Sequence, residues 1–269
     1  MSRSARPRPP RAFRPSRAVI WHDAECGAYT ADLALWRELA EQAGGAVLEL
    51  GAGTGRVALD LAGEGHPVTA LDSDAELLGE LAARAKRAGL GVETVVADAR
   101  RLPGRAANGS LQAPERALPE AGFALVIAPM QFLQIVGGRV GRAAVLRAVA
   151  RALMPGGRFA AALARLDDAV PPLDAAPPLP DVSERDGWVF SSLPLDVRPE
   201  AGGVAVERLR QIVTPAGELS EERHTQVLES LSAEQLEAEA AAAGLQPEAR
   251  HVIGATDDHV GSEVVVCRR

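Results

Sequence analysis

Three glycines on alternate positions follow a short apolar run near residue 50. They are Gly51, Gly53 and Gly55, and Glu49 stands two residues before the first of them. A strand that turns at once into a helix lets a ligand approach the backbone closely, because glycine has no side chain to collide with it. The free N–H groups at the start of the helix lie at the same place. The stretch LELGAGTGR therefore predicts a ligand-binding turn.

The spacing and charge of this turn separate two kinds of ligand. The dinucleotide fingerprint is G-x-G-x-x-G, and here Arg56 holds the position of its third glycine. Glu49 is also foreign to that fingerprint, since its carboxylate would repel a pyrophosphate and attract a cation. We therefore expect a positively charged ligand. A dinucleotide-dependent oxidoreductase stays as a rival hypothesis, which a cofactor-binding titration would decide.

Two further carboxylates end later apolar runs. Asp72 comes about 20 residues after the turn, a distance typical of a carboxylate that accepts both hydroxyls of a ribose. Asp98 ends the run 92–98 and can accept a hydrogen bond from an exocyclic amino group such as that of adenine. Ligands of parallel α/β sheets bind outside the carboxyl ends of the strands, so we expect all three acids at one edge.

Four motifs in this order resemble class I S-adenosylmethionine-dependent methyltransferases. They are ELGAGTG at 49–55, Leu71-Asp72, Ala97-Asp98-Ala99 and LMPGG at 153–157. The resemblance covers roughly residues 29–269, and the stretch ECGAYTADLALW is similar to bacterial small-molecule enzymes of the glycine/sarcosine N-methyltransferase type. It implies S-adenosyl-L-methionine as cofactor and in-line methyl transfer to a nitrogen or oxygen of a small molecule. The sequence leaves open a non-catalytic cofactor-binding partner or regulatory module.

The resemblance also implies roles for single residues. Glu49 and the glycines would hold the methionine part of the cofactor, Asp72 its ribose and Asp98 its adenine. The full set expected to bind cofactor is Tyr29, Glu49, Gly51, Ala52, Gly53, Gly55, Asp72, Ser73, Ala97, Asp98, Ala99, Ala128 and Met130.

The sequence does not identify the base that would take a proton from the acceptor. The catalytic candidates are Tyr29, which is the only tyrosine, Gln131 after the fourth strand and His259 before the last strand. Gln134 is a weaker candidate. Each also has an ordinary interpretation, as a packed ring, a helix cap or a solvated loop residue.

The chain carries few signs of a nucleic-acid or metal-dependent mechanism. Its fourth strand ends Ala128-Pro129-Met130-Gln131, which lacks the polar first residue and the stacking aromatic of amino-methylating DNA enzymes. No metal-binding carboxylate set can be placed, so we predict no metal. Trp188 and Phe190 are more typical of a small core than of a substrate cage, yet they are the best candidates for an apolar pocket wall.

Alternating patterns predict how these residues are positioned. Apolar runs at 46–50, 67–72, 92–98, 123–129 and 158–163 alternate with helical segments, and strands near 248–254 and 262–268 complete the set. We expect a doubly wound, mostly parallel seven-stranded α/β sheet. Helical patterns precede the first strand and follow Ser73 and Ser232, and each of these serines has a capping-box partner three residues later. After residue 164, a Pro-rich linker and three strand-like runs predict a small antiparallel β insertion.

Length and charge bound the domain organisation and the partners. We expect a disordered Arg/Pro-rich leader at 1–17 and one methyltransferase-like domain at 18–269, in which 165–230 form the linker and the insertion over the substrate side. Without the six leader arginines, 23 basic residues face 36 acidic ones, a charge of −13 that disfavours nucleic acid. Two distant cysteines predict a reducing cytoplasm. We expect a small-molecule substrate and no membrane, and a homodimer is left open.

Overall fold

A computed structural model of the chain describes residues 16–102, 118–166, 178–256 and 259–269. Most of the predicted leader, most of the Gly/Pro/Ala-rich connection at 99–122 between the third and fourth strands and most of the Pro-rich linker at 171–180 lie outside these residues. No helix in the described ranges is both long and apolar enough to cross a membrane.

The central sheet has the mostly parallel order that the strand–helix alternation predicts. Its strands run β10-β12-β5-β4-β1-β2-β3, and β11 pairs with β12. β12 is antiparallel to β5, whereas β1 to β5 are parallel to one another where they pair. The strands are β1 (Val47–Leu50), β2 (Val68–Asp72), β3 (Val92–Val96), β4 (Phe123–Ala128), β5 (Leu153–Ala164), β10 (Gln246–Pro247), β11 (His251–Ile253) and β12 (Ser262–Arg268).

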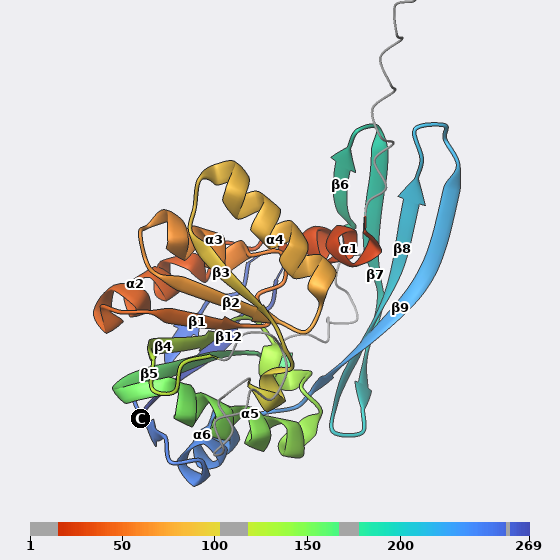
Figure 1. Ribbon diagram of the computed structural model, residues 1–269. Helices are drawn as coiled ribbons and strands as arrows, with labels where there is room; N and C mark the ends of the chain where they lie inside the picture. The colour runs from red at the N-terminus through yellow and green to blue at the C-terminus, as the bar shows by residue number, and fades with distance from the viewer. Residues whose placement is uncertain (1–15, 103–117, 167–177, 257–258) are drawn as a thin grey trace, which may run out of the picture.

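Helices cover both faces of this sheet (Figure 1). On one face lie α2 (Leu33–Ala43), α3 (Arg56–Gly63) and α4 (Ala75–Ala88), and on the other α5 (Gly138–Ala152) and α6 (Ala233–Ala242). The central strands are buried on both sides, which is why their sequences are continuously apolar instead of alternating. The doubly wound α/β fold is therefore confirmed.

The predicted insertion is a separate four-stranded antiparallel sheet that stands beside the body (Figure 1). It consists of β6 (Asp181–Arg185), β7 (Trp188–Glu200), β8 (Gly203–Val213) and β9 (Leu219–Glu229), paired in chain order. The turn between β8 and β9 falls at the predicted TPAG. The short edge strand β6 was not anticipated from the sequence.

A helix absent from the sequence prediction joins the two sheets. α1 (Arg17–Cys26) begins at the last residue of the predicted leader and buries Ile20 and Trp21 against Phe190 and Ile212 of the second sheet. Its polar side binds that sheet as well, since the Glu25 carboxylate accepts from both Arg210 Nε and Nη2, at 2.7 and 2.9 Å. This helix therefore sets the position of the second sheet against the body.

Capping explains where two helices begin. At α6, Ser232 and Gln235 form the predicted capping box. At α4, the predicted Ser73 box is wrong: the helix is capped by Asp74, whose carboxylate accepts from the N–H groups of Glu76 and Leu77. A carboxylate one residue later is the better cap because its charge also complements the helix dipole.

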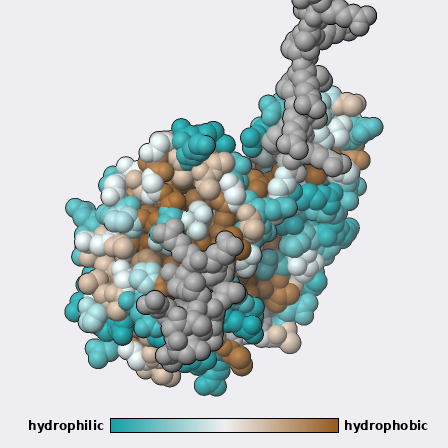
Figure 2. Space-filling model, viewed as in Figure 1, coloured by the Kyte–Doolittle hydropathy of each residue, from teal (hydrophilic) through white to brown (hydrophobic). Residues whose placement is uncertain are grey.

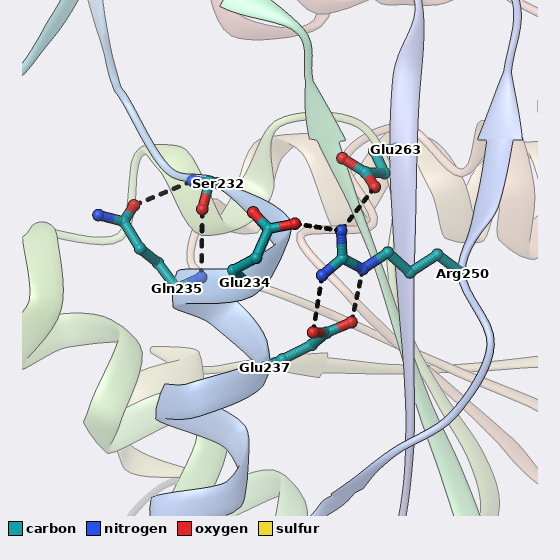
Figure 3. A network of polar contacts seen from close by, with 6 residues as sticks. All are labelled: Ser232, Glu234, Gln235, Glu237, Arg250 and Glu263. Atoms are coloured by element: carbon teal, nitrogen blue, oxygen red, sulfur yellow. Dashed lines mark hydrogen bonds and ion pairs between the residues drawn. The ribbon is translucent and has the colours of Figure 1, made fainter.

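A single arginine ties α6 to the last strands (Figure 3). Arg250 donates to Glu237 through Nε and Nη2, and its Nη1 reaches Glu234 and Glu263. These contacts hold the pKa of Glu234 at about 2, with Arg250 as the main cause. The network keeps α6 packed behind β12.

Candidate active site

A cavity of about 800 Å³ lies between the carboxyl ends of the parallel strands and the second sheet. Gly51, Asp72, Ala97, Met130 and Ala164 line it at or just after the ends of β1 to β5, one residue for each strand. α1 and strands β7 to β9 supply the opposite wall. In the space-filling view, apolar side chains gather in the hollow between the two parts (Figure 2).

The glycine turn has the backbone conformation that its sequence requires. Gly51, Gly53 and Gly55 have φ of 68°, 55° and 92°, in the left-handed region that side chains disfavour. Space is short as well: a Cβ on Gly53 would lie 2.0 Å from His22 Nε2, and one on Gly51 would lie 2.5 Å from the Phe132 ring. The turn therefore has no side chains at its three glycines, and the rings of His22 and Phe132 pack closely against its backbone.

Glu49 lines the cavity and is almost fully buried. The residue is 3% exposed, and its Oε2 has no hydrogen-bond partner among the described residues. Burial raises the pKa of Glu49 to about 8, against the lowering effect of nearby Arg56. An unpaired buried carboxyl is costly and is relieved by a cationic donor, so this position fits the ammonium group of an amino acid.

The two other predicted acids also lie at the cavity but already have partners. Asp72 accepts from the N–H of Gly53 through Oδ2 and from that of Asp74 through Oδ1, both at 2.9 Å. Asp98 is half-exposed and binds the Arg100 side chain, which lowers its pKa. Each carboxylate has further lone pairs, so each can accept a hydroxyl or amino group in addition.

The segment after β4 combines strain with polar groups. Met130 has φ of 55°, unusual for a residue with a side chain, and both Met130 and Gln131 line the cavity. Gln134 does not line it. Its amide bonds the N–H and C=O of Ala164 and the C=O of Glu229, so it joins β5 to β9. This saturated bonding makes Gln134 a poor candidate for a base.

Tyr29 and His259 form a pair at one side of the cavity. Their ring centroids are 4.7 Å apart, and His259 lines the cavity whereas Tyr29 lies behind it. The Tyr29 hydroxyl is buried near Ser262, and burial raises its pKa against the lowering effects of Arg56 and Ser262. Arg56 lies over the Tyr29 ring at 5.2 Å and binds Asp32 and the Tyr29 C=O. The contacts of Arg56 therefore hold the Tyr29 ring in place beside His259.

Most of the residues predicted from sequence meet at this cavity. The predicted residues that line it are Glu49, Gly51, Ala52, Asp72, Ser73, Ala97, Asp98, Ala99, Met130, Gln131 and His259. Tyr29, Gly53, Gly55 and Ala128 lie in the layer behind. The favoured interpretation of Trp188 and Phe190 as a small core is confirmed: their ring centroids are 6.4 Å apart and they pack in the cluster that holds α1, so the alternative pocket-wall role is not supported.

Sequence reasoning missed the residues that α1 brings to the cavity. Trp21, His22, Glu25 and Cys26 all line it. His22 lies above the glycine turn, its Nδ1 is 3.2 Å from Thr54 Oγ1, and burial lowers its pKa despite the raising effect of Asp23. The run WHDAEC contains reactive side chains, but its Pro-rich surroundings hid the helix.

Comparisons with known proteins agree with this architecture. A family model described as a methyltransferase domain matches residues 47–157, from β1 through the LMPGG motif. A search of curated proteins found no match.

Solved structures share the fold at low sequence identity. A sugar N-methyltransferase from Streptoalloteichus is 18% identical, with a TM-score of 0.66 over 100% of this chain and 99% of that one. An amino pentose methyltransferase from Micromonospora echinaspora, solved with S-adenosylmethionine bound, is 17% identical, with a TM-score of 0.65 over 96% and 100%. An S-adenosylmethionine-dependent methyltransferase from Clostridium acetobutylicum is 14% identical, with a TM-score of 0.64 over 92% and 96%.

The narrower glycine/sarcosine likeness gains no support from these findings and stays a prediction. Residues 47–157 match a methyltransferase domain, and the described chain shares the fold of these solved methyltransferases.

Proposed function

We propose that this enzyme methylates a nitrogen or oxygen atom of a small molecule by in-line displacement, in the cavity between the body and the second sheet. The observation that carries the proposal is the unpaired, buried Glu49 oxygen beside the bare glycine turn. A sulfonium amino acid presents a cationic ammonium group to such an oxygen. A dinucleotide would present a pyrophosphate, which supplies no cation to this buried carboxyl.

The body residues would orient the cofactor in one direction along the sheet edge. Glu49 and Gly51 would take the amino-acid end, Asp72 the ribose hydroxyls, and the segment Ala97–Ala99 the adenine, with Asp98 as acceptor of its amino group. The bound cofactor supplies a methyl group on a sulfonium whose departure needs no acid. The chain's task is therefore alignment and exclusion of water, and alignment alone is worth several powers of ten.

Loss of the Asp72 carboxylate is expected to weaken binding of S-adenosylhomocysteine, measured by calorimetry. Asp72→Ala removes a hydrogen-bond acceptor and leaves the Gly53 N–H without its partner, so the expected loss is about 1–3 kcal/mol, or roughly 5–150-fold in Kd. Asp74→Ala is the matched control, because Asp74 caps α4 without lining the cavity. It should lower the melting temperature and keep the affinity. An unchanged Kd in Asp72→Ala would remove this acid from the site.

His259 is the base that we propose for an acceptor that must lose a proton. It lines the cavity and is held by the Tyr29 ring, and Gln131 can orient the acceptor from the other side. Two of the similar structures are described as a sugar N-methyltransferase and an amino pentose methyltransferase, so amines are the first acceptors to test.

His259→Asn is expected to lower kcat about 10²-fold, at the low end of general-base effects, with an unchanged Kd for S-adenosylhomocysteine. The assay follows S-adenosylhomocysteine by mass spectrometry with a panel of amines and alcohols. His251→Asn is the control, because His251 is half-buried on β11 outside the cavity. Equal kcat in both variants would exclude His259 as base. Cofactor binding without acceptor-dependent turnover would favour the binding-module alternative.

A further inference from the structure

On the face of the second sheet that lines the cavity, some polar side chains are paired and others have no partner among the described residues. Alternate residues of a strand share a face. Val206, Arg208 and Arg210 of β8 and His224 and Gln226 of β9 all line the cavity. This wall lies opposite Glu49 and Asp72, so its chemistry concerns the acceptor side.

The Nε and Nη2 edge of Arg210 is already occupied. Its Nε and Nη2 bind both oxygens of Glu25, at 2.7 and 2.9 Å, and its guanidinium lies 5.3 Å from the Trp21 ring centroid. A neutralised and stacked guanidinium offers little to a ligand.

Arg208 is only half engaged. Its Nη1 binds Asp181 at 2.7 Å and Ser192 Oγ at 3.1 Å, whereas Nε and Nη2 have no partner among the described residues. These two groups form the edge of the guanidinium that donates two parallel hydrogen bonds to a carboxylate or phosphate. The side chain is 22% exposed, so such a pair would be shielded from water.

The neighbouring strand supplies more donors at the same place. His224 is the direct cross-strand partner of Arg208, and Gln226 faces Val206 two residues further along. Neither ring nor amide has a partner in the described parts of the chain. Beside them, Val197, Val206 and Leu228 give the wall an apolar section.

We propose that this wall binds an anionic group, a carboxylate or a phosphate, on a methyl acceptor whose remaining body is apolar. The anion would lie against Arg208, His224 and Gln226, and the apolar body against Val197, Val206 and Leu228. The acids of the body wall repel an anion, so the acceptor enters in one orientation, with its nucleophile toward Met130 and Gln131. This inference rests on the proposed function, because it assigns the acceptor end of the same cavity.

The test uses four aromatic probes of similar size on the full chain, with and without saturating S-adenosylhomocysteine. Calorimetry or ligand-observed NMR measures binding of phenyl phosphate, benzoate, benzamide and benzylamine. We expect at least one anion to bind tenfold or more tightly than benzamide, and benzylamine to bind weakest. The ratio of the dissociation constants of phenyl phosphate and benzoate shows whether the wall prefers a phosphate or a carboxylate.

Variants assign the anion to the wall. Arg208→Met and His224→Leu should each raise the Kd of the preferred anion tenfold or more and leave the Kd of S-adenosylhomocysteine unchanged. His224→Leu breaks no described contact, so it stays informative if Arg208→Met is unstable. Arg223→Met is the matched control, since its side chain is 69% exposed and pairs with Glu207 outside the cavity.

The outcomes separate this inference from the proposed function. The anion-site inference would be overturned if benzamide or benzylamine bound as tightly as the anions. It would also be overturned if neither wall variant changed anion binding. In both cases binding of S-adenosylhomocysteine would persist. Failure to bind S-adenosylhomocysteine would instead contradict the proposed function, and the probes on the cofactor-free chain would still decide the anion site.

Discussion

Gly53→Val is expected to abolish binding of S-adenosylhomocysteine, with Kd raised beyond the detectable range. Gly53 has φ of 55°, which a β-branched residue adopts only under strain. Its Cβ would lie 2.0 Å from His22 Nε2, so the histidine ring must leave the turn. The displaced His22 ring, which already lines the cavity, would move into the space beside the turn where we expect the cofactor. Calorimetry measures the loss, and thermal unfolding confirms that the chain remains folded.

Two controls separate the causes of this loss. Gly65→Val introduces the same residue at φ of 90° with nothing within 4 Å, so it should cost stability and keep the affinity. The double variant Gly53→Val/His22→Ala removes the ring that the introduced valine side chain would strike. We expect this double variant still not to bind S-adenosylhomocysteine, because the backbone strain at φ of 55° remains. Tight binding by Gly53→Val alone would contradict the account of the turn.

Glu49→Gln is expected to weaken the binding of S-adenosylhomocysteine by about 3–5 kcal/mol, because the substitution leaves the ligand ammonium buried without its counter-charge. The same variant should change the pH dependence of stability. The pKa of Glu49 is raised from 4.5 to about 8 by burial, so between these values the folded state holds a proton that the unfolded state does not. The free energy of unfolding therefore falls as pH rises through this window, by up to about 1.4 kcal/mol per pH unit.

Chemical denaturation of the cofactor-free wild type between pH 5 and 8 should show this slope. In Glu49→Gln the part of the slope that comes from Glu49 should disappear, because the amide does not titrate. Ligand binding at pH 7 should also release up to one proton, because the ammonium favours the charged carboxylate. Calorimetry in two buffers of different ionisation enthalpy measures that proton. Equal affinity and equal pH slopes in both proteins would show that Glu49 faces no cation.

The acids and glycines of the body could be predicted because their signal is local. Glu49, Gly51 and Asp72 each lie at a strand end, and parallel strands bring their carboxyl ends to one edge whatever the loops between them do. The strand–helix alternation is equally local, so the doubly wound sheet followed from it. Element boundaries were less certain, as the cap of α4 at Asp74 instead of Ser73 illustrates.

The acceptor side could not be predicted because it depends on contacts far apart in sequence. Glu25 meets Arg210 across 185 positions, and it occupies in Arg210 the Nε and Nη2 edge that in Arg208 has no partner among the described residues. Trp188 and Phe190 were expected in a small core, but the sequence did not show that α1 completes that core. No periodicity in β8 or β9 reveals which face another helix will cover, so Arg208 and His224 were not recognised.

A crystal structure of the full chain with S-adenosylhomocysteine tests the central claim most directly. The account predicts the ligand amino nitrogen within hydrogen-bond distance of Glu49 Oε2, the ribose hydroxyls at Asp72 and the adenine beside Asp98. A ligand bound elsewhere, or in this cavity with Glu49 Oε2 still lacking a partner, would contradict it.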